Sequence, residues 1–259
     1  MIVRAGAATD VGRQRKHNED SVLAEGSVFV VADGMGGHAA GEVASGIATT
    51  TLAELAGLER RRSEDVVEAL QRANHRILES VASHPEQSGM GTTVAGLTVV
   101  TAGGSDHWAV FNVGDSRVYR CIDDRLNLVT VDHSEVRELI DGGFITEEEA
   151  ARHPLRNVVT RSLGSETAPT PDVWVFPPHP GERFVICSDG LSNELAADDI
   201  RRLATGSDDP QQAAEALVAA AVQAGGRDNV SVIVVALDAD EQEQDLDADT
   251  SPRTSAGAG

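Results

Sequence analysis

Acidic residues recur at four places where the sequence predicts strand ends or tight turns. These clusters are Asn18-Glu19-Asp20, Asp33-Gly34, Asp189-Gly190 and Arg227-Asp228-Asn229. Carboxylates that lie close together do not all stay ionised without a counter-charge, so a fold that gathers these clusters needs a cation. The clusters therefore favour a single domain, because segments as distant as residues 18 and 229 have to share one site.

Two of the clusters follow the same local pattern. The apolar run 28–32 predicts a buried strand that opens into a glycine-rich turn at Asp33-Gly34, and the run 184–188 leads in the same way into Asp189-Gly190. A plain turn before a helix is the alternative interpretation of Asp33-Gly34 alone. The repetition of the pattern favours a metal site over that alternative.

The other candidate ligands are also oxygen atoms. Asp228 stands just before a final apolar run, and Gly34 lets a backbone carbonyl approach a cation without hindrance from a side chain. Asp115, between Gly114 and Ser116, is a further candidate ligand, although type I turns commonly have this composition. Oxygen ligands without Cys or His at metal-binding spacing favour Mg²⁺ or Mn²⁺ over Zn²⁺.

A paired metal site of this kind suits the hydrolysis of phosphate esters. Two divalent ions about 3.5–4 Å apart activate a water and hold phosphate oxygens in line for its attack. A cationic side chain must also orient the phosphate, and arginine does so through paired hydrogen bonds. Arg15, four residues before Glu19, is the best-placed candidate. The alternative is a surface arginine beside Arg13 and Lys16.

Charge and composition exclude several classes of protein. The chain of 259 residues has a formal net charge of −21 and a single lysine, so we expect no binding to nucleic acid or to an anionic membrane. No apolar stretch is long enough to span a membrane, and residues 1–10 have no apolar region of signal-peptide length, so we expect neither a membrane span nor a signal peptide. Cys121 and Cys187 stand in apolar runs and are interpreted as buried, reduced thiols. We expect a cytoplasmic monomer with a disordered acidic tail over residues 238–259.

The order of the expected elements predicts an α+β fold. Helices are expected at 38–55, 63–81, 135–141, 146–153, 198–204 and 210–224. Strands are expected at 28–32, 92–101, 107–113, 117–122, 126–131, 173–176, 183–188 and 230–237. Two antiparallel sheets packed face to face, each covered by a helix pair, would bury all of these elements. The sequence therefore predicts one four-layer domain over residues 1–237.

Other phosphatase and hydrolase chemistries lack their residues here. Neither cysteine is followed six positions later by arginine, because those positions hold Asn127 and Asn193. The sequence has no Gly-x-Ser-x-Gly elbow, no His-x-x-x-His pair, and no Lys-Ser/Thr pair after the 33–38 loop. Water activated by metal is the chemistry that remains.

A series of ordered motifs resembles the metal-dependent Ser/Thr protein phosphatases of type 2C, particularly their bacterial branch. The motifs are Arg15-x-x-Asn18-Glu19-Asp20, Asp33-Gly34-Met35-Gly36-Gly37-His38, Met90-Gly91-Thr92-Thr93, Val113-Gly114-Asp115-Ser116-Arg117, Asp132-His133-Ser134, Cys187-Ser188-Asp189-Gly190-Leu191 and Arg227-Asp228-Asn229-Val230. The resemblance covers residues 5–237. It implies a four-layer αββα sandwich with a Mg²⁺ or Mn²⁺ pair in a cleft between the sheets.

The resemblance also implies a role for each candidate residue. Asp33 would bridge both ions and Gly34 would ligate through its carbonyl. Asp189 and Asp228 would complete the shell of the first ion, and Glu19 would hold waters on the second. Asp115 would bind a weaker third ion together with Asp189, and Arg15 would grip the substrate phosphate. The segment 134–165 would form a variable flap beside the cleft that contributes to substrate choice.

Three positions depart from the family pattern. Met35 stands where many eukaryotic members carry a histidine thought to protonate the leaving alkoxide, so a metal-bound water is the alternative acid. Asn193 stands where relatives often have an acid, which would weaken binding of a third ion. Ser134 follows Asp132-His133 where eukaryotic members favour lysine, and we interpret His133 as structural.

The leading hypothesis is a phosphatase that acts on phosphoserine and phosphothreonine in proteins and counteracts bacterial Ser/Thr kinases. A narrower hypothesis keeps the fold and limits the substrate to a phosphorylated sigma-factor antagonist. Two hypotheses from different classes are a silent module that binds phosphoproteins and an ATP-binding regulator that uses residues 33–36. The acids retained at positions 33, 189 and 228 argue against a silent module.

Overall fold

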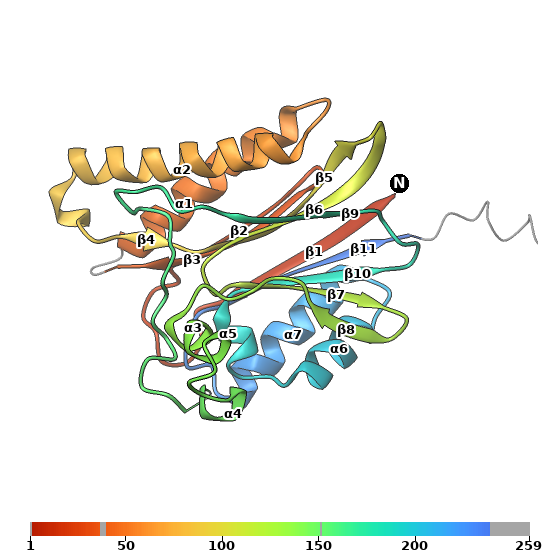
Figure 1. The fold of residues 1–259 in the computed structure, drawn as a ribbon. Helices are drawn as coiled ribbons and strands as arrows, with labels where there is room; N and C mark the ends of the chain where they lie inside the picture. The colour runs from red at the N-terminus through yellow and green to blue at the C-terminus, as the bar shows by residue number, and fades with distance from the viewer. Residues whose placement is uncertain (1, 37–39, 151, 239–259) are drawn as a thin grey trace, which may run out of the picture.

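Two antiparallel sheets packed face to face form the centre of the computed structural model, which describes residues 2–36, 40–150 and 152–238 (Figure 1). One sheet has the strand order β1 (Val3–Asp10), β11 (Val230–Leu237), β10 (Arg183–Cys187), β7 (Arg117–Ile122) and β8 (Arg125–Leu128). The other has the order β2 (Asp20–Glu25), β3 (Val28–Met35), β5 (Val94–Ala102), β6 (Ser105–Val113) and β9 (Asp172–Phe176), with the short β4 (Gly91–Thr92) also paired to β3.

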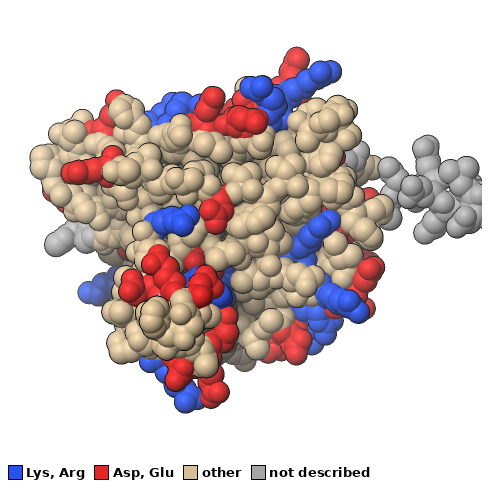
Figure 2. Space-filling view, in the orientation of Figure 1, with Lys and Arg blue, Asp and Glu red and all other residues tan. Residues whose placement is uncertain are grey.

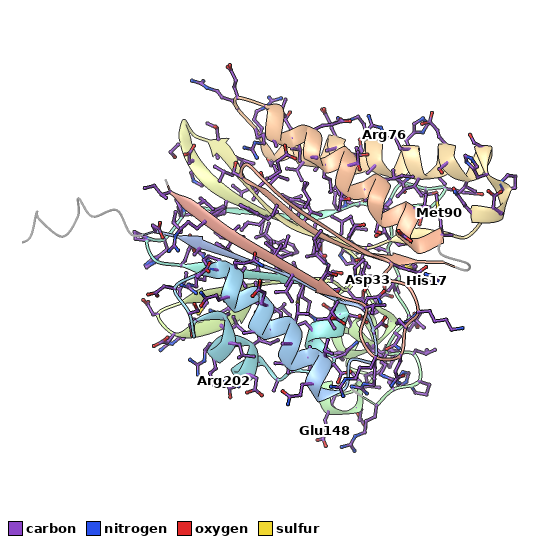
Figure 3. All side chains as sticks on the ribbon, turned by 180° about the vertical axis from the view of Figure 1, so that it is seen from behind. His17, Asp33, Arg76, Met90, Glu148 and Arg202 are labelled. Atoms are coloured by element: carbon purple, nitrogen blue, oxygen red, sulfur yellow. The ribbon has the colours of Figure 1, made fainter. Side chains whose placement is uncertain are left out.

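Each sheet is covered on its outer face by helices, which confirms the predicted four layers (Figure 1). The pair α1 (Ala40–Ala53) and α2 (Ser63–Ser83) packs on the sheet that contains β3. The pair α6 (Ala197–Ala204) and α7 (Pro210–Ala224) packs on the sheet that contains β11. In Figure 3, Arg76 lies in one helix layer, Arg202 in the other, and Asp33 between them.

Short helical segments complete the fold. They are the 3₁₀ helices Glu54–Gly57 and Pro85–Gln87 and the α-helices α3 (Glu135–Asp141), α4 (Glu147–Ala150) and α5 (Asp189–Ser192). The predicted helix 146–153 corresponds to α4, which is shorter than predicted. Pro154 disfavours helical backbone at His153, the predicted last residue of that helix. The predicted start of the first helix, His38, lies outside the described residues.

The continuous apolar runs of the central strands are explained by burial on both faces. In β3, Val28, Val30 and Ala32 pack under the helices, whereas Phe29 and Val31 face the opposite sheet. The residues of β11 alternate between the two environments in the same way, and all eight are buried. Successive side chains of a strand point to opposite faces of the sheet, so a strand that is covered on both faces is apolar at nearly every position.

Strands β1 and β2 were not predicted from the sequence. They are edge strands of the two sheets, and the half-exposed residues of β1 give no apolar run. The free edge of β1 is covered by the side chain of Gln211, which donates to the Ala7 carbonyl and accepts from the Ala7 N–H, both at 3.0 Å. Gly6 permits this approach, because a Cβ atom there would lie 2.2 Å from the Cα of Gln211.

Two acidic residues have a local structure different from the one predicted. Strand β3 continues to Met35, so Asp33 lies within the strand rather than after it. The pairing of Gly34 and Met35 with β4 explains the extension. Asp189 is the first residue of helix α5 rather than part of a turn.

The predictions for the cysteines, for a membrane span and for the tail can be compared with the described residues. Cys121 and Cys187 are buried and unpaired, as predicted. No helix among the described residues is long and apolar enough to cross a membrane. The predicted acidic tail lies outside the described residues apart from Asp238, whose carboxylate accepts a hydrogen bond of 2.7 Å from Arg4.

A buried ionic contact links β6, β7 and the start of β10. The carboxylate of Glu182 is fully buried and accepts hydrogen bonds from Trp108 Nε1 at 2.6 Å and from Arg120 Nε at 2.5 Å. We expect Glu182→Ala to lower the free energy of unfolding by about 3–5 kcal/mol, because it leaves a partly buried guanidinium and a buried indole N–H without an acceptor. Urea denaturation measures this. The control Asp141→Asn removes an exposed ion pair with Arg137 and should not change the midpoint. A loss below about 1 kcal/mol for Glu182→Ala contradicts this explanation.

Candidate active site

The first two acidic clusters meet in the hairpin formed by β2 and β3. Asp20 and Asp33 are directly opposite each other in the strand pairing. The Gly34 N–H donates to the carbonyl of Glu19 at 3.2 Å. Gly34 is enclosed by backbone, because a Cβ atom there would lie 2.2 Å from the Gly41 carbonyl oxygen and 2.4 Å from that of Glu19. This contact holds the Asp33-Gly34 segment against the Glu19 backbone.

The backbone of Asp33 is fixed by a pair of threonines. Its N–H donates to Thr93 Oγ1 at 3.1 Å, and its carbonyl accepts from Thr93 N at 2.9 Å and from Thr92 Oγ1 at 3.0 Å. Thr93 Oγ1 is also 2.7 Å from the hydroxyl of Ser116, next to Asp115. The motif Met90-Gly91-Thr92-Thr93 therefore positions Asp33 and links it to the turn that carries Asp115.

The other two clusters lie at one end of the opposite sheet. Asp189 follows β10 and Asp228 precedes β11, and these two strands are antiparallel neighbours. Oδ2 of Asp189 accepts from the side-chain amide of Asn193 at 3.0 Å. Oδ1 of Asp228 accepts from the Asn229 N–H at 2.8 Å. Both acids are partly exposed, which leaves them accessible to a ligand.

The carboxylates of the two sheets are close enough to perturb one another. Burial raises the pKa of Asp33 well above its ordinary value, and four neighbouring carboxylates raise it further. These neighbours are Asp20, Asp189, Asp115 and Asp228. Burial also raises the pKa of Asp189 to about 6, with a further contribution from Asp228. Carboxylates raise one another's pKa only when they lie close together. These shifts therefore support the prediction that acids distant in sequence gather at one place.

Asp20 is a member of this group that the sequence analysis did not select. Burial raises its pKa to about 7, although a hydrogen bond of 2.8 Å from Ser188 Oγ to its Oδ2 opposes the shift. Its other oxygen, Oδ1, is buried and has no hydrogen-bond partner among the described residues. The sequence analysis chose the neighbouring Glu19. Only the pairing register of β2 with β3 distinguishes the two, because it places Asp20 opposite Asp33.

The donor set fits a hard divalent cation. The group offers carboxylate oxygens and the carbonyl of Gly34, which are the ligands preferred by Mg²⁺ and Mn²⁺. The unpartnered oxygen of Asp20 points to a missing positive partner, since a buried polar atom without a partner is costly. Within residues 2–36, 40–150 and 152–238, no three His, Cys, Asp or Glu side chains are already arranged to enclose an ion. Carboxylates repel one another when no cation lies between them, which explains why they do not already enclose an ion. The fit of the site to a divalent cation therefore rests on the kind of donor atoms that it offers.

Asp115 lies in the turn between β6 and β7, which His133 holds in place. The His133 N–H donates to the Gly114 carbonyl at 2.9 Å, and the Gly114 N–H donates to His133 Nδ1 at 3.0 Å. His133 is buried, and its Nε2 is 3.1 Å from the carboxylate of Asp172. These contacts agree with the structural role predicted for His133. Burial and the neighbouring Asp189 raise the pKa of Asp115 to about 7.

Arg15 and Glu19 lie on the loop that connects β1 to β2. The Arg15 guanidinium donates a hydrogen bond of 2.7 Å to Oδ2 of Asp228, and its side chain is half-exposed. Besides Asp228, the carboxylates of Asp33 and Glu19 act on it electrostatically. Arg15 therefore lies at the surface, as the alternative interpretation expected, but its guanidinium is turned toward the acids. In Figure 3, the same loop brings His17 to the end of the sandwich at which Asp33 lies.

A cleft with a volume of about 1010 Å³ extends from the acids to the predicted flap. Its lining includes the candidate residues Arg15, Asp115, Asp189 and Asp228. The flap contributes Ser134, Val136, Arg137, Ile140, Asp141, Glu147, Ala150, Arg156 and Asn157. Figure 2 shows acidic side chains at the lower left, over the part of the molecule where Figure 1 places α3. Residues between 134 and 157 thus line one wall of the cleft.

Comparison with known proteins gives the family. The sequence profile described as Protein phosphatase 2C matches residues 12–229, a range that includes every candidate site residue. The chain belongs to the protein phosphatase 2C family. It is 38% identical over 239 residues to the serine/threonine protein phosphatase PstP of Mycobacterium tuberculosis, and the match covers 90% of this chain and 45% of PstP. The phosphatase 2C chain thus spans about half the length of that relative.

Further relatives match over nearly their whole length. The serine/threonine phosphatase Stp of Listeria innocua is 34% identical to this phosphatase 2C chain over 242 residues, which cover 88% of this chain and 93% of Stp. A crystal structure of PstP has a TM-score of 0.83 at 37% identity and covers 92% of this chain and 100% of that one. The PstP catalytic domain in complex with two manganese ions has a TM-score of 0.81 at 34% identity, covering 91% and 99%. These similarities confirm the predicted family and fold.

Proposed function

We propose that this phosphatase 2C chain removes phosphate from phosphoserine and phosphothreonine in proteins, using a water activated between two divalent metal ions. The observation that carries the proposal is the group of carboxylates around Asp33, which raise one another's pKa. The relatives named serine/threonine protein phosphatases support the substrate class. The two manganese ions in the PstP catalytic domain support the pair of ions.

The chain's own residues divide into those that hold ions and those that hold substrate. Asp33 would bridge the two ions and Gly34 would contribute its carbonyl. Asp189 and Asp228 would complete the shell of the first ion, and Glu19 would hold waters on the second. Asp20, buried beside them with a free oxygen, is suited to accept a hydrogen bond from such a water. When bound, the two ions would lower the pKa of a shared water and neutralise phosphate oxygens.

Arg15 would bind the phosphate of the substrate. Its guanidinium lies at the mouth of the site against Asp228 and presents several N–H donors in one plane. Paired hydrogen bonds from this guanidinium to the phosphate would hold the phosphorus in place for attack by the water. Met35, directly after Gly34, has no proton to give, so a metal-bound water would be the acid for the leaving alkoxide.

Finer parts of the proposal depend on the same residues. Asp115, with Asp189, would hold a third, weaker ion, and the hydrogen bond from Asn193 to Asp189 would compete with that ion. The flap wall of the cleft would contribute to the choice of phosphoprotein. Five further points stay predictions. They are the use of Mg²⁺ or Mn²⁺ in the cell, action on Ser/Thr kinases, a cytoplasmic location, a monomeric state and the absence of nucleic-acid or membrane binding.

Phosphate release from a phosphothreonine peptide tests the proposal. The protein is stripped with a chelator, dialysed, and assayed with and without added Mn²⁺. Turnover that appears only with the metal supports a metal-dependent phosphatase. Folded protein that binds the phosphopeptide without turnover in excess Mn²⁺ favours the silent binding module instead, and equal turnover with and without metal contradicts the two-ion proposal.

We expect Arg15→Ala to lower kcat/KM for the phosphothreonine peptide by about 10²-fold, because a charge-assisted contact with the phosphate is lost. Initial rates at saturating Mn²⁺ measure this. Arg13→Ala is the matched control, since Arg13 is an exposed arginine of the same loop. The assignment of Arg15 is wrong if both variants retain parental kcat/KM.

A further inference from the structure

The loop that carries Arg15 is fastened at both ends by one side chain. Asn229 is buried and follows Asp228 at the start of β11. Its Nδ2 donates to the carbonyls of Val11 and His17, both at 3.0 Å, and its Oδ1 accepts from the Glu19 N–H at 2.9 Å. One carboxamide thus ties the beginning of the loop to its end.

These three bonds use both N–H donors of the carboxamide and one of the two acceptor positions of its oxygen. A primary amide offers two N–H donors, and the three contacts occupy both of them together with the oxygen. No other uncharged side chain of similar size offers both donors and an acceptor from this position. An alanine would leave the carbonyls of Val11 and His17 and the Glu19 N–H without their partner inside the protein.

Backbone contacts hold the same two segments together. The Arg13 N–H donates to the Gly226 carbonyl at 2.6 Å. Gly12 has φ +76°, and a Cβ atom there would lie 2.2 Å from the Asp228 carbonyl oxygen. The loop is therefore shaped against residues 226–229. It closes so that the Arg15 guanidinium reaches Oδ2 of Asp228 at 2.7 Å.

We propose that Asn229 is a positioning residue that holds the 11–19 loop so that Arg15 meets the phosphate beside Asp228. Asn229 touches neither the phosphate nor the metal and acts through Arg15. The inference rests on the proposed function, because it assumes that Arg15 binds the phosphate. Its structural half, the fastening of the loop, stands on the three hydrogen bonds alone.

A proteolysis experiment tests the fastening without any assay of activity. Lys16 is the only lysine of the chain, and it is exposed within this loop, so a lysine-specific endoprotease has one site. We expect Asn229→Ala to raise the rate of cleavage at Lys16 by about tenfold, because three hydrogen bonds that close the loop are lost. Unchanged cleavage overturns the proposal.

Asn74→Ala is the matched control for stability. Asn74 is also a buried amide that ties a loop, since it donates to the Ser165 carbonyl at 3.1 Å and accepts from the Gly164 N–H at 2.8 Å. We expect this variant to lose stability without faster cleavage at Lys16. A rise in cleavage equal to that of Asn229→Ala would show general loosening and overturn the proposal. Asn229→Ser, which introduces a hydroxyl in place of the carboxamide, replaces Asn229→Ala if the latter does not fold.

A double-mutant cycle tests the action through Arg15. With p-nitrophenyl phosphate and saturating Mn²⁺, we expect Asn229→Ala to lower kcat/KM by about tenfold and Asn74→Ala to leave it unchanged. In an Arg15→Ala background, Asn229→Ala should lower kcat/KM no further, because coupled residues are non-additive. Additive losses overturn the proposal. A parent without Mn²⁺-dependent turnover overturns the proposed function, and cleavage at Lys16 still decides whether Asn229 fastens the loop.

Discussion

Asp33→Asn is expected to lower Mn²⁺-dependent phosphate release by about 10³-fold, the largest loss expected of any single substitution in this chain. Asp33 is the carboxylate on which the neighbouring acids act from both sheets. An amide there keeps the size of the side chain and removes the charge that would bridge two ions. Initial rates on a phosphothreonine peptide at saturating Mn²⁺ measure the effect. Asp106→Asn, in the exposed hairpin of β5 and β6, is the control and should retain parental rates.

The same substitution is expected to have the opposite effect on stability without metal. In the presence of chelator, Asp33→Asn should melt at a higher temperature than the parent, because it removes a buried acid that must either stay charged among like charges or take up a proton on folding. Added Mn²⁺ should raise the melting temperature of the parent and change that of the variant much less, since a ligand stabilises only the form that binds it. Equal activity of the variant and the parent, or an equal shift with Mn²⁺, would exclude Asp33 from the metal site.

The free energy of unfolding of the chelator-treated protein is expected to fall by several kcal/mol between pH 5 and pH 8. In the folded protein the pKa of Asp20 and of Asp115 is raised to about 7, and that of Asp189 to about 6. In the unfolded chain these groups lose their protons near the ordinary value of about 3.9. The folded state therefore holds more protons across this interval, so stability decreases as pH rises through the folded pKa values.

Urea denaturation at a series of pH values measures this dependence. Some acids have a pKa lowered by an ion pair, such as Glu194 beside Arg227. The stability that they contribute is lost only when the pH falls below their pKa in the unfolded chain, so they do not change the free energy of unfolding between pH 5 and pH 8. Repulsion among the many acids of the chain also lowers the free energy of unfolding as the pH rises. The effect of the site is therefore isolated by comparing the pH dependence of Asp33→Asn with that of the control Asp106→Asn. The free energy of unfolding should fall less steeply with pH in Asp33→Asn than in Asp106→Asn. A stability that is constant or rises from pH 5 to pH 8 contradicts the proposed arrangement of the acids.

The parts of the fold that could be predicted are those whose burial leaves a local pattern. Strands β3 and β11 lie inside the sandwich, and burial on both faces makes nearly every residue apolar. The acids that end or begin such runs, Asp33, Asp189 and Asp228, were therefore visible as a set. Strands β1 and β2 lie at sheet edges, where half-exposed residues give no such run, and they were missed.

The parts of the site that could not be predicted depend on contacts between distant segments. The choice between Glu19 and Asp20 is decided by the register of β2 against β3, which no local pattern specifies. The role of Asn229 appears only when its side chain is seen to join Val11 and Glu19. A polar residue beside a candidate ligand was the available signal, and it does not identify the partners.

Anomalous diffraction from a crystal soaked in Mn²⁺ tests the central claim most directly. We expect two peaks about 3.5–4 Å apart, both in contact with the carboxylate of Asp33. One of them should also contact Asp189 and Asp228, and the other the carbonyl of Gly34. Peaks elsewhere in the molecule, or none in crystals of protein that releases phosphate in the same Mn²⁺ concentration, would contradict the claim.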